Sequence, residues 1–180
     1  RHLVPACALP VRDPSTAVRD QLSKFDRPLL EAVGRRSVRF VRVQWLVNLP
    51  DSYDAIERCQ VLEERERQDR ANRIFLSPME AQACVESGHR QLAVVAWGWV
   101  TRADPDPTLS RFRALKAFFQ RPEIAGRYVG VFVDVMCLPF PPWRTVKEEE
   151  RHQDGTRAIG FLCASPLATT VLQFDWLPDR

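Results

Sequence analysis

The side chain best placed to do chemistry is Asp134, which we expect at the carboxyl end of an apolar strand. In an open α/β sheet, ligands bind beside the carboxyl ends of the parallel strands, so a carboxylate there could contact one. The structural alternative is a carboxylate that accepts backbone N–H groups of the following loop. Trp97 and Trp99 close the preceding apolar run. Asp134, Trp97 and Trp99 are therefore our candidates for a ligand pocket.

The other reactive side chains lack the spacing that catalysis or metal binding needs. The acidic run 148–150 opens an expected helix, where the helix dipole alone favours such residues. His152, Asp154 and Cys163 do not have the spacing of a catalytic triad. The five cysteines are scattered without a CxxC pair, which predicts buried or inert thiols. No glycine-rich phosphate loop occurs. We expect no catalytic residue, no metal and no cofactor.

A run of alternating strands and helices between residues 92 and 174 must position these side chains. The apolar runs 92–100, 129–135 and 168–174 lack polar alternation, which is typical of strands covered on both faces. Helical patterns begin at Thr108 and Thr145 between them. Parallel neighbours need a crossover that can hold a helix, so this order predicts a mostly parallel sheet with flanking helices. The expected fold class is α/β, of flavodoxin-like type.

The helix from Thr108 should be amphipathic. Leu109, Phe112, Leu115 and Phe119 predict its buried stripe. The basic residues of the same helix are expected to face out: Arg111, Arg113 and Lys116.

The first part of the chain is less regular. Residues 1–36 predict an extended N-terminal arm with one helix from Ser15 to Phe25. Residues 37–49 alternate like a half-exposed edge strand that Pro50 ends. We expect two further helices, one within 53–73 that is rich in opposite charges and one from the Ser77 capping box to about Glu86.

Four arginines around the expected edge strand could form a basic face: Arg35, Arg36, Arg39 and Arg42. Such a face could contact nucleic acid. Alternatively, these charges are a solvated edge that discourages sheet-to-sheet aggregation.

Composition sets the limits for these interpretations. The chain of 180 residues, with 45% hydrophobic and 27% charged residues, is typical of one globular domain with an extension. The net charge of +3 does not indicate a nucleic-acid binder as a whole. No apolar run approaches the roughly 18 residues of a membrane-spanning helix. The chain begins with Arg1, which suggests a processed protein that has lost a targeting segment.

Three segments resemble the TIR-like domains of algae and protists: AWGWVTRADPDP, VFVDVMCLPFPPWRTVKEEE and GFLCASPLATTVLQF. A weaker similarity links them to fungal heterokaryon-incompatibility domains. The resemblance is closest over 90–175 and implies a truncated TIR-like domain over 37–180.

The same resemblance bears on activity. Catalytic TIR domains use a glutamate beyond the third strand on the nicotinamide–ribose bond, and no matching glutamate follows Phe174 here. Ala96, Trp97, Gly98 and Phe140 also stand where the family pattern has residues that could hydrogen-bond a ligand. The resemblance therefore implies a domain without its catalytic groups.

We interpret the chain as a non-catalytic structural or interaction subunit of a larger protein assembly. Its expected contact surface includes the proline loop, residues 139–143, where aromatic side chains stand among prolines: Phe140, Pro141, Pro142 and Trp143. One alternative is a TIR-type hydrolase of NAD or another nucleotide, with Asp134 in its pocket. Another is a ribonucleoprotein subunit that makes weak nucleic-acid contact through the four arginines. A eukaryotic microbe would suit the family resemblance. An intracellular organelle, plastid or mitochondrion, would suit a processed start, and the compartment stays open.

Overall fold

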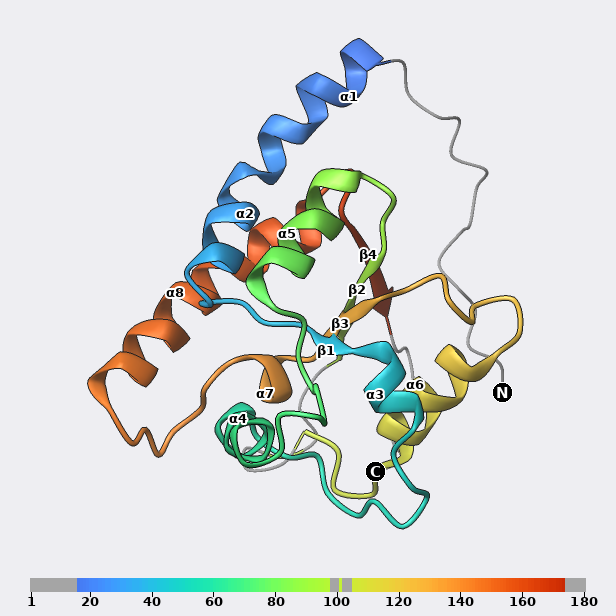
Figure 1. Cartoon of the computed structure of the whole chain (residues 1–180), viewed down its shortest axis with the longest axis vertical. Helices are drawn as coiled ribbons and strands as arrows, with labels where there is room; N and C mark the ends of the chain where they lie inside the picture. Colours follow the sequence, from blue (N-terminus) through green and yellow to red (C-terminus); the bar gives the residue numbers. More distant parts are fainter. Residues whose placement is uncertain (1–15, 98–100, 102–104, 174–180) are drawn as a thin grey trace.

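The computed structural model describes residues 16–97, 101 and 105–173, and within them it is a mixed α/β fold. Its sheet has the strand order β1-β3-β2-β4 (Figure 1). Strands β2 (Leu92–Ala96), β3 (Gly130–Phe132) and β4 (Thr169–Gln173) are parallel, and β1 (Val41–Arg42) is antiparallel to β3. The predicted fold class, a mostly parallel sheet with flanking helices, is confirmed at this level.

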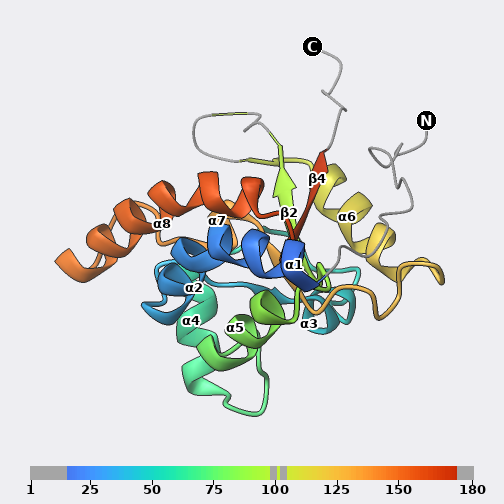
Figure 2. The same cartoon turned by 90° about the horizontal axis from the view of Figure 1, so that it is seen from above.

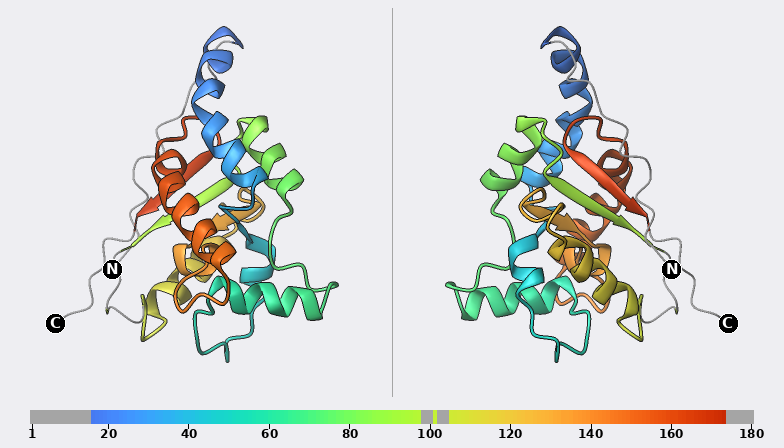
Figure 3. Two further views of the ribbon diagram at one scale, coloured as in Figure 1. Left: turned by 90° about the vertical axis from the view of Figure 1, so that its left-hand side faces the viewer. Right: turned by 90° about the vertical axis from the view of Figure 1, so that its right-hand side faces the viewer.

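Helices cover both faces of the sheet. Helix α6 (Ser110–Gln120) joins β2 to β3, and α8 (Val146–Ala164) joins β3 to β4. The two crossovers run in opposite directions along the sheet, and right-handed crossovers then place their helices on opposite faces. Figures 2 and 3 show α8 with α2 and α5 on one side and α6 with α3 on the other. Buried strand β2 lies at the centre of this arrangement.

Helix α5 (Pro78–Ser87) agrees with its local sequence signals. The Ser77 hydroxyl accepts the Glu80 N–H at 3.2 Å, and the Glu80 carboxylate accepts the Ser77 N–H at 2.9 Å. Gly88 ends the helix in the left-handed region, with φ at 64°. The predicted helix is confirmed almost to its ends, because every signal that specifies it lies within a few residues.

The predicted edge strand over 37–49 is wrong in length. It is the last strand of the four-stranded order, but Val41 also forms an antiparallel bridge to Phe75 on its other side. Only Val41–Arg42 pairs with β3, and the chain then turns into helix α3 (Val43–Val47). The helix buries Val43 and Leu46, while Lys116 and Gln120 of α6 donate to the carbonyl groups of Leu49 and Val47. Tertiary contacts with α6 thus outweigh the strand-like alternation of the local sequence.

The predicted arm is partly helical. Helix α1 (Thr16–Ser23) and the 3-10 helix η1 (Lys24–Asp26) confirm the expected helix, but α2 (Arg27–Gly34) stands where extended chain was predicted. Leu29 and Val33 of α2 are core residues that pack toward α5 and α8. Their spacing of four, after Pro28 at the helix start, is the signal that the prediction missed. Residues 1–15 lie outside the described residues.

One smaller expectation needs correction. On α6 the apolar stripe is buried as predicted, but Arg111 is only 3% exposed instead of facing out, and Lys116 bonds to the loop after α3. Of the cysteines, Cys59, Cys84 and Cys137 are buried, whereas Cys163 is exposed. Cys7 lies outside the described residues. The described part of the chain has no helix that is long and apolar enough to cross a membrane.

Candidate functional site

The carboxyl ends of β2 and β3 form the topological switch point of the sheet. The chain leaves β2 toward α6 on one face and leaves β3 toward α8 on the other. In open α/β sheets the crevice between two such strands is where ligands bind. The register pairs Val94 with Phe132, so Ala96 comes level with Asp134 when the pairing is extended by two residues. Asp134 and Trp97, both predicted as candidates for a ligand pocket, therefore lie at one edge of the sheet. Trp99 lies outside the described residues.

Asp134 is the first residue of α7 (Asp134–Cys137), a single helical turn after β3. Its Oδ1 accepts the N–H of Val135 at 2.7 Å, and the side chain is half-buried. A carboxylate at a helix start is favoured by the backbone N–H groups there. This geometry is that of the structural alternative, a carboxylate that accepts a backbone N–H.

The thiol of Cys137 completes the same turn. It accepts the N–H of Val133 at 3.3 Å and donates to the carbonyl of Val131 at 3.6 Å. Burial raises the pKa of Cys137 to about 12, which keeps it protonated at neutral pH. The turn after β3 therefore offers no activated nucleophile.

Two buried charged residues near the start of α6 were not anticipated. Asp106 accepts the N–H of Phe112 at 2.8 Å and the hydroxyl of Ser110 at 3.4 Å. Arg111, which stands between these two residues in the sequence, is also buried. The bonds of Asp106 are those of a residue that caps a helix start. The Asp-Pro pairs of this turn could have suggested a cap, but nothing local predicts the burial of Arg111.

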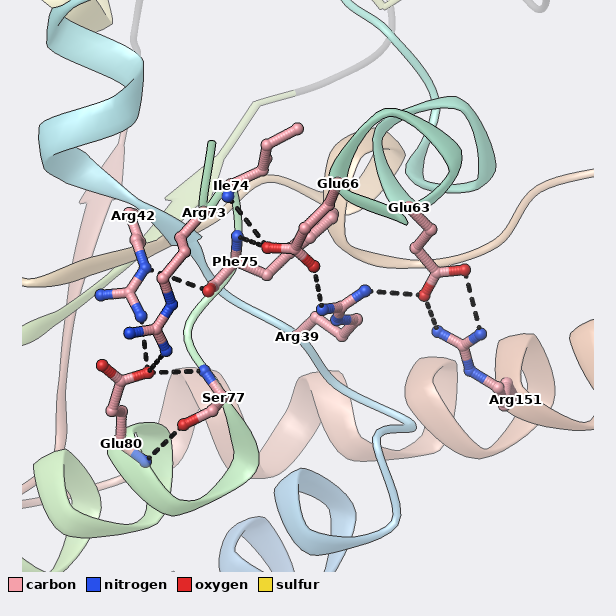
Figure 4. A network of polar contacts seen from close by, with 10 residues as sticks. All are labelled: Arg39, Arg42, Glu63, Glu66, Arg73, Ile74, Phe75, Ser77, Glu80 and Arg151. Carbon is pink, nitrogen blue, oxygen red and sulfur yellow. Dashed lines mark hydrogen bonds and ion pairs between the residues drawn. The ribbon is translucent and has the colours of Figure 1, made fainter. Parts of the chain in front are cut away.

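The basic face expected from the edge arginines is replaced, at two of its four positions, by ion pairs (Figure 4). Arg39 contacts Glu63 at 2.9 Å and Glu66 at 3.2 Å, and Arg151 of α8 contacts Glu63 at 2.7 Å. Burial alone would raise the pKa of Glu63, but the hydrogen bonds and charges of Arg151 and Arg39 outweigh it and lower that pKa. Both glutamates belong to α4 (Cys59–Gln68), so these contacts hold α4 against α8 and the segment before β1.

Arg42 is engaged in the same way. Its guanidinium contacts Glu80 at 2.5 Å and donates to the carbonyl of Phe75 at 3.1 Å, and Arg73 joins Glu80 at 2.9 Å. The hydrogen bond from Arg42 is the largest influence that lowers the pKa of Glu80 to about 2. Arg35 and Arg36 are exposed. The predicted basic face is thus reduced to these two residues.

Helix α4 also fixes the backbone of the proline loop. The Gln60 amide donates to the carbonyl of Phe140 at 2.6 Å and accepts the Phe140 N–H at 3.2 Å. Arg58 donates to the carbonyl of Pro141 at 2.6 Å. The Phe140 ring is half-buried, and its centre lies 5.0 Å from the centre of the His152 ring on α8. The centre of the Trp143 ring lies 5.8 Å from the same His152 ring.

Most apolar side chains of this region nevertheless point to solvent. Pro141 and Pro142 are exposed, Trp143 is 36% exposed, and Val146 at the start of α8 is 72% exposed. The structure therefore separates the four predicted interface residues: Phe140 anchors the loop, and the other three are presented outward.

Two cavities in the described part of the chain lie away from the switch point. One, of about 360 Å³, is bounded by η1, α2 and the end of α8. The other, of about 10 Å³, lies between the end of α2, the segment before β1 and the start of α5. The described residues contain no group of three or more His, Cys, Asp or Glu that could hold a metal ion.

Comparisons of this chain with protein-family models, with curated proteins and with solved structures find no match. What the fold defines is thus a class: a mixed α/β protein with a four-stranded, mostly parallel sheet flanked by helices. The TIR-like resemblance of residues 90–175 stays a proposal.

Proposed function

We propose that this chain is a non-catalytic interaction subunit of a larger protein assembly, built on a degenerate TIR-like domain, and that it binds a protein partner at the proline loop. The observation that carries the proposal is a rigid backbone beneath exposed apolar side chains. Gln60 and Arg58 make three hydrogen bonds with the loop backbone, donating two and accepting one, while Pro141, Pro142 and Trp143 are exposed.

Rigidity matters because ordering a loop costs free energy when a complex forms. A loop already held by its own protein loses little conformational freedom on binding, so more of the contact energy appears as affinity. Tryptophan is among the residues that most often dominate binding energy, and prolines add apolar area without rotamer entropy. Val146, the first residue of α8 and three residues after Trp143 in the sequence, is a further exposed apolar side chain.

The hydrolase alternative rests on the neighbouring positions of Asp134 and Trp97 at the switch point. Its support is weaker, because the Asp134 carboxylate bonds to the N–H of the next residue and burial keeps the Cys137 thiol of the same turn protonated. The nucleic-acid alternative loses support through the ion pairs of Arg39 and Arg42, which already contact carboxylates.

Partner binding is tested by comparing two truncations of similar exposure. Trp143→Ala removes the proposed anchor, and Val61→Ala removes an apolar side chain that is 41% exposed on α4. Native complexes are isolated from cells that express each variant at the wild-type level. We expect one defined partner to be lost with Trp143→Ala and retained with Val61→Ala. Equal retention by both variants would refute the loop as the binding surface.

Catalysis is tested separately. Purified wild-type protein is incubated with NAD, and the release of nicotinamide is followed together with an Asp134→Ala variant. We expect no turnover by either protein. Turnover by the wild type that disappears with Asp134→Ala would overturn the non-catalytic proposal in favour of the hydrolase.

A further inference from the structure

Helix α1 and η1 carry an outward face that the described part of the chain does not cover. Figure 1 shows α1 rising away from the body of the molecule. Val18 is 44% exposed and Phe25 is 69% exposed, and their spacing of seven residues places them along one side of this face. Asp26 faces the other way and is buried next to Ser165 after α8. The end of this helical segment is therefore held at Asp26, while the side that carries Val18 and Phe25 is exposed.

The free face borders the larger cavity. Lys24, Phe25 and Pro28 line one wall of the 360 Å³ space, and Phe161 and Ala164 of α8 line the other. Phe161 is itself exposed. An apolar projection and an apolar hollow thus lie side by side, at the end of α8 opposite to the proline loop (Figure 1). Such a pair can complement itself when a second copy is turned by a two-fold axis.

The charges of α1 and η1 have the same self-complementary spacing. Asp20 and Lys24 are exposed, four residues apart, along the other side of the outward face. Within the described residues, no ion pair forms between these two side chains or from either of them to a third. Asp20 and Lys24 carry opposite charges, and they lie at almost equal distances along the chain from the midpoint between Gln21 and Leu22.

We propose that this face binds the same face of a second copy of the chain, with the two α1 helices antiparallel. A two-fold axis perpendicular to both helices, beside the midpoint of Gln21 and Leu22, brings Val18 of one copy level with Phe25 of the other. The same axis brings Asp20 within one residue of Lys24 of the other copy, about 1.5 Å along the helix. This axis leaves the apolar residues of both copies on one side of the interface and the charged residues of both copies on the other side. The contact between Val18 and Phe25 and the ion pair between Asp20 and Lys24 therefore form together, and each occurs twice.

This arrangement accounts for the hollow as well. With the helices antiparallel, Val18 of the second copy enters the cavity beside Phe25 and Phe161, and both apolar projections leave water. A partner of unrelated sequence would account for the apolar side chains but not for the spacing of Asp20 and Lys24. The surface is distinct from the proline loop, so the inference does not depend on the proposed function.

The test exploits the two-fold symmetry. Wild-type protein is examined by analytical ultracentrifugation over a concentration series, and we expect a monomer–dimer equilibrium. Asp20→Lys alone or Lys24→Asp alone places like charges opposite each other at two sites, so each variant should dimerise at least about tenfold more weakly. Mixed in equal amounts, the two variants should form a heterodimer, because each new charge then faces its opposite.

Controls separate a lost interface from a lost fold. Glu123→Lys reverses an exposed charge on the turn after α6 and should dimerise like the wild type. Circular dichroism of all variants reports folding, and Phe25→Ser removes the apolar contact without a change of charge, which should also abolish dimerisation. The proposal is overturned if the wild type stays monomeric at its highest soluble concentration. It is equally overturned if a dimer forms that the single variants do not weaken or the mixture does not restore.

Discussion

Helix α8 passes so close to the segment before β1 that its Gly155 has room for no side chain. A Cβ atom added at Gly155 would overlap the carbonyl oxygen of Ser37 and the Cδ2 atom of Leu138. Ser37 offers backbone, which cannot move aside by rotamer rotation. Gly160, five residues further along the same helix, would place a Cβ in open space. The two glycines therefore permit one substitution to be compared at two sites in a single helix.

The expected magnitudes follow from these contacts. Alanine is a better helix former than glycine by about 1 kcal/mol, so Gly160→Ala should stabilise the protein by roughly 0.5–1 kcal/mol. At Gly155 the same gain is opposed by an overlap with backbone, and overpacking in a core costs roughly 1–3 kcal/mol or more. We expect Gly155→Ala to destabilise the protein by about 1–2 kcal/mol. The melting temperatures of the two variants should then differ by roughly 5–10 °C for a chain of this size.

Urea unfolding followed by tryptophan fluorescence measures both variants. A shift of the midpoint at an unchanged dependence on urea reports stability, whereas a changed dependence would indicate an altered unfolded or native state. Circular dichroism should show that both variants keep the native helix content. If Gly155→Ala stabilises the protein as much as Gly160→Ala does, α8 is not pressed against Ser37 and the reasoning is refuted.

Two further predictions concern titratable groups. The pKa of Glu80 is about 2 in the folded protein against an ordinary 4.5, so its carboxylate adds stability at neutral pH that is lost as the pH falls from about 4.5 toward 2. Urea unfolding at several pH values should therefore show the wild type to be more stable than Glu80→Gln at pH 6, and the difference in stability should shrink below pH 4. A difference that does not change with pH would contradict the ion pairs of Glu80. Glu123→Gln serves as the control. Burial raises the pKa of all four described cysteines, but only Cys163 is exposed. In a Cys7→Ser background, a thiol reagent should modify one thiol in the native protein and all four remaining thiols in denaturant. Cys163→Ser should remove the single reaction of the native protein. Two or more reactive thiols in the native protein would contradict the burial of Cys59, Cys84 and Cys137.

The sequence predicts best where the determining contacts are local or repeat along one element. The capping box before α5 and the apolar runs of β2, β3 and β4 are of this kind, and their elements appear where expected. Helix α3 was missed because Lys116 and Gln120, which hold its end, lie far along the chain. Local alternation cannot report such contacts.

The same distinction applies to the candidate site. Strand order alone brings Trp97 and Asp134 to one edge, because parallel strands end on the same side of a sheet. The role of Arg39 was not foreseeable, since its carboxylate partners are on α4 and its pattern with Val38 and Val41 is that of an exposed edge. The burial of Arg111 likewise depends on what packs over α6.

The antiparallel pairing of β1 with β3 has a consequence for the order in which the protein can fold. A chain is synthesised from its N-terminus, and β1 has no sheet to join until Val131 has been made. Until then the side chains of Leu29, Val33 and Phe40, which the finished protein buries completely or almost so, have no sheet to cover them. Strands β2, β3 and β4 with α6 and α8, in contrast, come from one continuous stretch of the chain. We therefore expect the N-terminal half to be the more aggregation-prone part of the chain during its synthesis.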